Sequence, residues 1–161
     1  MIRPIAREDR ESVLDLLRAT NNFTAAELAV ADELINIVVS QPLQKDYFAF
    51  VEVVDARAGR CVGMFVTGPT PATEGTWQLY WIAVHPLYHG TGAAQALETY
   101  AEAFVRRRGG YWLLAETSSQ VSYERARAFY RKRGYVELAQ IPDYYKPLDN
   151  LLIYGKRLDS F

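Results

Sequence analysis

Apolar residues recur at helical spacing in four parts of this chain. In the first two parts the apolar positions fall on one side of a helix, and Asp9 and Thr24 precede them as candidate N-cap residues. The third and fourth parts each end at a glycine, Gly109 and Gly134, as is common where a helix stops. The pattern predicts helices from Asp9 to Asn21, from Thr24 to Gln41, from Thr91 to about Arg108 and from Tyr123 to Arg133.

Runs rich in β-branched and aromatic residues lie before, between and after these helices. They predict strands at Ile2–Ala6, Tyr47–Asp55, Arg60–Gly68, Thr76–Val84, Tyr111–Thr117, Tyr135–Ile141 and Leu151–Leu158. The link Ala56–Gly59 suits a hairpin, whereas the loop Pro142–Asp149 is too long for a tight one. Because antiparallel strands are followed by strand-helix-strand crossovers, we expect an α/β (α+β) fold with a mixed sheet and helices on both faces.

Composition narrows the class of protein. The length of 161 residues predicts one domain, and an apolar fraction of 50% with 23% charged residues is typical of a globular chain. A net charge of -1 gives no support for a nucleic-acid partner. Cys61 is the single cysteine, which excludes an intrachain disulfide and favours a reducing compartment. With no apolar run long enough to span or enter a membrane, we expect a cytoplasmic protein with no membrane partner.

The fourth expected strand runs directly into the third helix through a loop of small residues. After Val84, a turn that contains Pro86 leads to Gly90 and Gly92. Backbone N–H groups cluster where a helix begins, and the helix dipole adds partial positive charge there. The loop is therefore a candidate phosphate site. Small residues are equally found where a helix packs tightly on its strand, and the spacing alone leaves both interpretations open.

The loop differs from two common phosphate-binding motifs, because no Lys-Ser/Thr pair follows Gly92 and the glycines lack the G-x-G-x-x-G spacing. It resembles instead motif A of the GNAT superfamily of acyl-CoA-dependent N-acyltransferases, (Q/R)-x-x-G-x-(G/A). His89 stands in the Gln/Arg position, Gly92 is the glycine and Ala94 is the last small residue. About forty residues later, the stretch from Ala126 to Tyr135 resembles motif B, which ends in a Phe-Tyr pair, basic residues, a glycine and an aromatic residue.

The resemblance implies a single GNAT-like acetyltransferase domain over residues 1–161, with acetyl-CoA as the acyl donor. It implies a mostly antiparallel mixed sheet of about seven strands flanked by about four helices. The strand backbone at Ile82, Ala83 and Val84 would bind the pantetheine arm. The pyrophosphate would be held by the loop residues His89, Gly90, Thr91, Gly92, Ala93 and Ala94. The family's Gln or Arg donates to the pyrophosphate; His89 can donate from a ring nitrogen, or it is an exposed turn residue with no role.

The resemblance also implies the chemistry, in which a primary amine attacks the thioester directly and no metal is required. Tyr130 of motif B would protonate the departing thiolate, unless it is simply a core aromatic residue. Glu116, near the end of the fifth expected strand, is the candidate general base, with Tyr80 as a possible participant through water. Glu116 could equally be a structural carboxylate.

The acceptor side is less constrained by the sequence. The family builds its acceptor pocket from the early helices and the last loop, which makes Phe23 and Tyr144 candidate substrate-binding residues. Tyr80, on the strand before motif A, is a third candidate. Tyr144 or Tyr145 could stack over a cationic amine, or these aromatic residues could seal an edge of the sheet. Small-molecule amines and protein amines both remain open as acceptors, as does a homodimer. The alternative function is a non-catalytic acyl-CoA-binding sensor or interaction module, because the strand Trp77–Ile82 carries no acidic residue.

Overall fold

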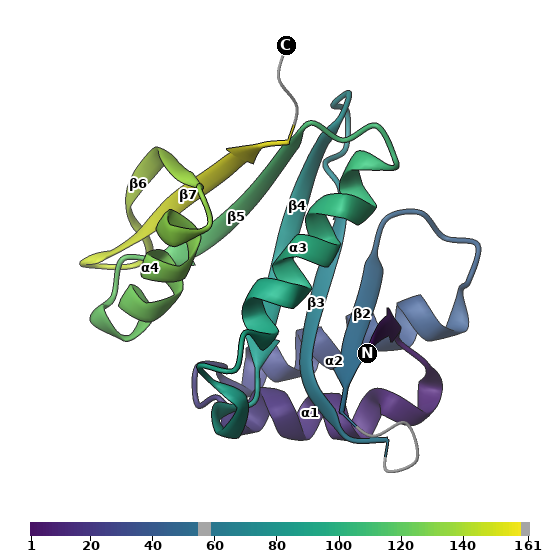
Figure 1. Ribbon diagram of the computed structural model, residues 1–161. Coiled ribbons are helices and arrows are strands. Elements are labelled where there is room, and N and C mark those ends of the chain that lie inside the picture. Colours follow the sequence, from purple (N-terminus) through teal and green to yellow (C-terminus); the bar gives the residue numbers. More distant parts are fainter. Residues whose placement is uncertain (55–58, 159–161) are drawn as a thin grey trace. The chain divides into compact units, whose positions relative to one another are not determined.

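The computed structural model describes residues 1–54 and 59–158 (Figure 1). Seven strands follow the order β1-β2-β3-β4-β5-β7-β6. Strands β4 and β5 run parallel, whereas β1–β2, β2–β3, β5–β7 and β7–β6 are antiparallel pairs. With the four α-helices of the described residues, this confirms the expected mixed, mostly antiparallel fold. The hairpin link expected at Ala56–Gly59 lies, except for Gly59, outside the described residues.

The chain divides into two compact units. The first comprises residues 1–68 and 81–103, and the second comprises residues 69–80 with the described part of 104–161. The first unit holds β1 (Ile2–Pro4), α1 (Arg10–Ala19), α2 (Ala25–Ser40), β2 (Phe48–Val53), most of β3 (Cys61–Pro69), the end of β4 (Thr76–Val84) and most of α3 (Ala93–Arg106). The second holds the start of β4, the last residues of α3, β5 (Trp112–Ser118), α4 (Glu124–Lys132), β6 (Val136–Lys146) and β7 (Asp149–Arg157).

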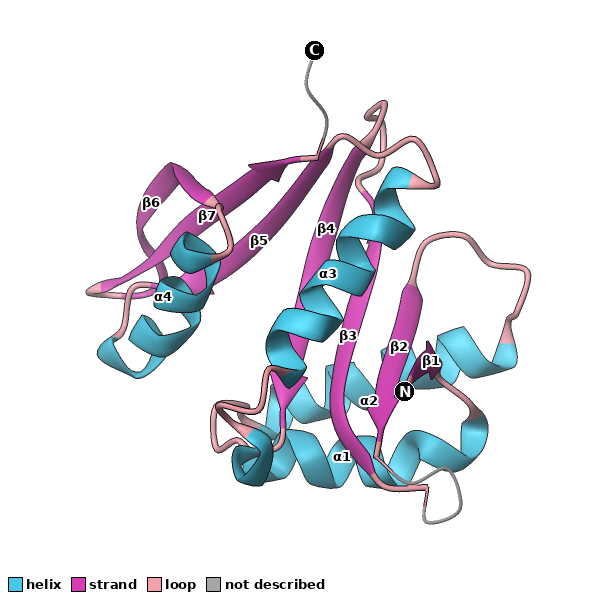
Figure 2. Ribbon diagram, viewed as in Figure 1, coloured by secondary structure: helices cyan, strands magenta, loops and turns pink. Residues whose placement is uncertain are grey.

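In the first unit, helices cover both faces of β2 and β3 (Figure 2). Side chains of α1 and α2 share one core cluster with Val51 and Met64 of the strands. On the opposite face, Tyr100 of α3 contacts the rings of Phe50 and Phe65 at centroid distances of 5.2 and 6.2 Å. Because successive side chains of a strand point to opposite faces, one apolar face of β2 and β3 packs against α1 and α2 and the other packs against α3.

The two expected N-caps differ. Thr24 caps α2 as predicted: its hydroxyl accepts from the Glu27 N–H, and the Glu27 carboxylate accepts from the Thr24 N–H. Asp9 occupies the N-cap position of α1 as predicted, but its carboxylate makes no cap hydrogen bond to that helix. Asp9 is buried and accepts two hydrogen bonds from the Arg3 guanidinium and one from the Ala6 N–H, so it ties the first strand to the turn before α1.

In the second unit, the last two strands form a tight hairpin. The loop predicted at Pro142–Asp149 is wrong: β6 continues to Lys146, which pairs with Asp149 across a two-residue turn. Pro142 is tolerated because β6 is an edge strand. The register shifts between Ile141 and Lys146, and Asp143 within this bulge has φ of 54°. Tyr144 therefore lies on a strand.

No helix in residues 1–54 and 59–158 is long and apolar enough to cross a membrane.

Candidate active site

The small-residue loop connects β4 to α3 as the sequence predicts. A short 3-10 turn, Pro86–Tyr88, follows β4, and α3 begins at Ala93. Between them, Gly90 and Gly92 have φ of 78° and 89°, a conformation that strains other L residues. A Cβ atom added at either glycine would meet no heavy atom within 4 Å. The loop thus presents bare backbone to open space.

The amide donors of this loop belong mainly to the first turn of α3. The Gly92 carbonyl accepts the N–H of Ala96 at 2.9 Å, which makes Gly92 the residue before the helix. The N–H groups of the following turn, starting at Ala93 and Ala94, have no acceptor within the helix. Earlier donors are engaged locally, since the His89 N–H donates to Pro86 and the Thr91 N–H and hydroxyl donate to Tyr88. An anion would therefore sit at the start of α3, where the helix dipole also favours it.

His89 is attached to the end of β4 by its ring. Its Nε2 lies 2.9 Å from the carbonyl oxygen of Val84. Because a carbonyl oxygen can only accept, Nε2 carries the proton and donates it. One lone pair of the Val84 carbonyl is thus engaged by the loop, which leaves its second lone pair and the Val84 N–H for the pantetheine arm expected there.

Close packing beneath the strand end keeps this region in place. Ala83 and Val84 are buried, whereas Ile82 is partly exposed. Gly63 of β3 lies directly against them and against α3: a Cβ there would be 2.6 Å from Leu97 Cδ1 and 3.3 Å from the Ala83 carbonyl oxygen. The absence of a side chain at Gly63 therefore lets α3 lie close to the sheet near the loop.

Tyr130 belongs to the second unit, in an aromatic cluster. It lies on α4 and is 7% exposed. Its ring stacks on Tyr154 of β7 at a centroid distance of 5.9 Å and contacts Tyr135 at 5.2 Å. The sequence left Tyr130 open between catalysis and packing, and this environment shows that packing is at least part of its role.

Arg127 fixes the start of α4 to the end of β5. Its guanidinium donates to the carbonyls of Ser118 and Gln120 at 2.6 and 2.9 Å, and it pairs with Glu124. The residue is 8% exposed. The sequence did not single out Arg127; its position one helical turn before Tyr130, on the same side of α4, was the available signal.

Glu116 and the β6 tyrosines lie near one another in the second unit. Glu116 is exposed on β5 opposite Ile153 of β7. Burial, reinforced by the negative charge of Glu116 and by Tyr144, raises the pKa of Tyr145 to about 12. The rings of Tyr144 and Tyr145 meet edge to face at 5.1 Å. Tyr145 was expected only as an alternative to Tyr144 for stacking on the acceptor; its proximity to Glu116 depends on the hairpin formed by β6 and β7, where the sequence predicted a loop.

Tyr80 shares a sheet face with Glu116, whereas Phe23 belongs to the first unit. Gln78 of β4 pairs with Leu114 of β5, so alternation along both strands puts Tyr80 and Glu116 on one face. Phe23 is partly buried against the core of α1, α2 and the strands. It directly precedes the N-cap Thr24, the position from which an apolar residue commonly packs on a helix start, and this gives it a structural role.

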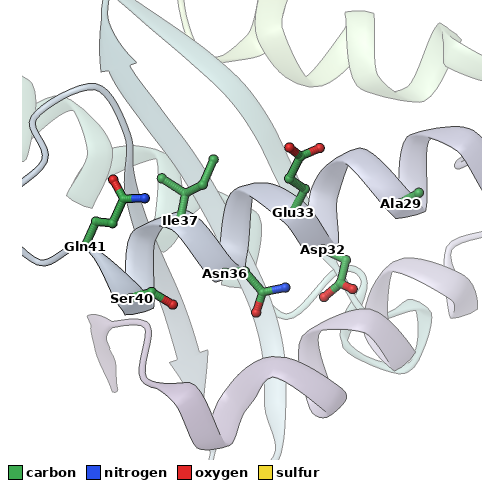
Figure 3. Close-up of a pocket in the computed structure, with 7 residues that line it drawn as sticks. All are labelled: Ala29, Asp32, Glu33, Asn36, Ile37, Ser40 and Gln41. Carbon is green, nitrogen blue, oxygen red and sulfur yellow. The ribbon is translucent and has the colours of Figure 1, made fainter.

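The first unit also contains two cavities. One, of about 410 Å³, runs along α2, where Asp32 points toward α1 and pairs with Arg10 (Figure 3). The other, of about 420 Å³, is lined by Ser12, Cys61 and His85 among others. Burial raises the pKa of the Cys61 thiol to about 11, so the thiol is poorly nucleophilic. Residues 1–54 and 59–158 contain no group of three or more His, Cys, Asp or Glu side chains suited to hold a metal ion.

Comparisons with known proteins agree with this architecture. Residues 11–135 match the acetyltransferase (GNAT) family. A crystal structure from Desulfovibrio desulfuricans, of a protein assigned to the GNAT acetyltransferases, is similar with a TM-score of 0.94 and 32% identity, over 99% of each chain. An aminoglycoside 6'-N-acetyltransferase complexed with coenzyme A has a TM-score of 0.77 and 19% identity, over 100% of this chain and 98% of the other.

The ribosomal-protein-S18-alanine N-acetyltransferase from Escherichia coli also has a TM-score of 0.77, with 18% identity over 100% of this chain and 95% of the other. These last two likenesses establish the fold alone. No curated protein sequence matches this one. From the match over residues 11–135 and the relative at 32% identity, the chain belongs to the GNAT family of acetyltransferases.

Proposed function

We propose that this enzyme transfers the acetyl group of acetyl-CoA to a primary amine. The observation that carries the proposal is the loop from His89 to Ala94, which presents bare glycine backbone and the unpaired amides of a helix start. A pyrophosphate fits such a set of donors. Two more observations agree: a relative with 19% identity is complexed with coenzyme A, and the chain belongs to a family of acetyltransferases.

In the proposed reaction the amine attacks the thioester carbonyl directly. Acetyl-CoA supplies the activated acyl group and the thiolate leaving group. Glu116 accepts the proton that the ammonium must lose, the nitrogen forms a bond to the acyl carbon, and the carbon–sulfur bond breaks. Tyr130 gives its phenolic proton to the departing thiolate. The nitrogen loses its second proton to solvent as the amide forms. The products are an N-acetylated amine, CoA and one proton released to solvent, and the proton on Glu116 returns through solvent to Tyr130.

Binding and turnover test this function separately. Isothermal titration with acetyl-CoA should give saturable binding, and failure to bind at millimolar cofactor would refute the proposal. A library of small amines and peptides is then tested for amine-dependent release of CoA thiol. Binding without turnover on any amine would favour the sensor over the enzyme, contrary to the family membership of the chain.

The roles of Tyr130 and Glu116 need variants that remove one group each. Tyr130→Phe should lower kcat by about 100-fold while acetyl-CoA binds normally, because general acid catalysis contributes about that much. Tyr135→Phe removes another buried hydroxyl of the same aromatic cluster and is the matched control. Glu116→Gln should abolish the low-pH limb of the kcat profile. Unchanged turnover in either catalytic variant would remove that residue from the mechanism.

The class of acceptor amine and the cellular location of the enzyme are proposals. Tyr80, Tyr144 and Phe23 are proposed to contact the acceptor, with support from the face that Tyr80 shares with Glu116. The similar structures include enzymes named for an aminoglycoside and for a protein alanine, so both small-molecule and protein amines are candidates. The cytoplasmic location stays a prediction from the sequence.

We further propose that the enzyme forms a homodimer through β6. This edge strand is exposed along its whole length and carries Leu138 and Tyr145 with 46% and 48% exposure. A second copy that covers these apolar side chains would remove them from water. Sedimentation equilibrium should give twice the mass of the chain, and Leu138→Lys should return a monomer. A monomeric wild-type protein at 100 μM would refute the dimer.

A further inference from the structure

His89 is the residue at which this chain departs from the motif it resembles. The motif has Gln or Arg there, and both side chains donate hydrogen bonds at any pH near neutral. A histidine has two ring nitrogens, and in the neutral ring one donates and the other accepts. What His89 offers to an anion therefore depends on what its ring already binds.

The structure determines which nitrogen is engaged. Nε2 donates to the Val84 carbonyl at 2.9 Å, so in the neutral ring Nδ1 is an unprotonated acceptor. The side chain is otherwise exposed, immediately before Gly90 and the amides of the loop. An acceptor lone pair at this position repels a phosphate oxygen. The same ring with a second proton, on Nδ1, donates a charge-assisted hydrogen bond and keeps its bond to Val84.

We infer that the enzyme takes up a proton at His89 when it binds the pyrophosphate of acetyl-CoA. The inference rests on the proposed function, in which the loop binds this group. Because binding and protonation are linked, a lower pH strengthens cofactor binding at His89, by up to about tenfold for each pH unit when one full proton is coupled. Gln or Arg at this position would bind the pyrophosphate without taking up a proton.

The same turn contains a second histidine, His85. His85 accepts the Leu87 N–H at Nδ1, and its ring lies 6.2 Å from that of Tyr88. His85 also lines a cavity with Asp15 of α1 and Arg60. The chain has two histidines, so His85 is the one other side chain of this type and serves as a matched control.

Proton uptake can be measured directly by titration calorimetry. Dephospho-CoA is the probe, because it keeps the pyrophosphate and lacks the 3′-phosphate, a monoester that would itself titrate near pH 6. At pH 7.5 the observed binding enthalpy is compared in HEPES and in Tris, whose protonation enthalpies differ. The wild type and His85→Gln should take up a measurable fraction of a proton, whereas His89→Gln and His89→Arg should take up none.

The pH dependence of affinity gives a second readout. Between pH 8 and pH 6 the dissociation constant of the wild type should fall at least fivefold, while that of His89→Arg stays within twofold. Binding with equal proton uptake in the wild type and in His89→Gln would overturn the inference and leave the proposed function standing. If no variant binds dephospho-CoA or acetyl-CoA, the proposed function itself fails.

Discussion

Replacing Gly63 by alanine tests whether the close approach of α3 to β3 stabilises the enzyme. The added Cβ would lie 2.6 Å from Leu97 Cδ1, 3.3 Å from the Ala83 carbonyl oxygen and 3.4 Å from Val84 Cγ2. The first distance is well inside van der Waals contact. Leu97 has 0% exposure, so its methyl group must push into packed neighbours. We expect Gly63→Ala to lower the free energy of unfolding by about 1–3 kcal/mol, the usual cost of overpacking.

A double-mutant cycle identifies the cause of that loss. Leu97→Ala alone creates a cavity and should cost about 2–5 kcal/mol. In the Leu97→Ala background the added Cβ of Gly63→Ala has room, so its own cost should fall by about 1 kcal/mol or more. Urea denaturation followed by circular dichroism gives all four free energies. If Gly63→Ala costs the same in both backgrounds, the contact with Leu97 is not what limits this position.

Three further changes test separate parts of the structure. Arg3→Met leaves the buried Asp9 carboxylate without its ion pair and should cost about 2–4 kcal/mol at pH 7 in urea denaturation. Burial alone would raise the pKa of Asp9, but the hydrogen bonds from Arg3 and Ala6 hold it below its usual value, so the stabilisation should disappear as the pH falls below about 4. Thr24→Ala removes the N-cap of α2 and should cost about 1 kcal/mol, with Thr24→Ser restoring most of it. In a spectrophotometric titration, Tyr145→Phe should remove one phenol that ionises near pH 12.

The elements whose signals are local could be predicted from the sequence. The helix after the small-residue loop is expected from Thr91 and observed from Ala93, because its apolar spacing and the glycine that ends it are both contained in the segment. The capping box of Thr24 is equally local. The position of Gly90 and Gly92 between strand and helix follows from the same pattern, and this was enough to suggest an anion site.

The errors arose where distant residues decide the structure. Pro142 and Asp143 resemble loop residues, but an edge strand tolerates both at a bulge, and which strand forms the edge depends on the whole sheet. Asp9 occupies the N-cap position, but Arg3 of the first strand draws its carboxylate away from α1. The bond from His89 to Val84 and the packing over Gly63 likewise depend on the folded turn and on α3.

The most direct test of the central claim is acetyl-CoA binding by two variants at Gly92. Asn and Asp both tolerate positive φ and differ in charge, so Gly92→Asn and Gly92→Asp separate electrostatics from backbone strain. A carboxylate about 5 Å from a pyrophosphate costs roughly 1–2 kcal/mol at an intermediate effective dielectric constant. Calorimetry should therefore give at least about tenfold weaker binding for Gly92→Asp than for Gly92→Asn.

The same pair of substitutions at Gly109 is the control, because that glycine also has positive φ and open space but lies at the far end of α3. Gly109→Asn and Gly109→Asp should bind acetyl-CoA equally well. Equal affinities of Gly92→Asp and Gly92→Asn would contradict the claim that this loop holds the pyrophosphate of the acetyl donor.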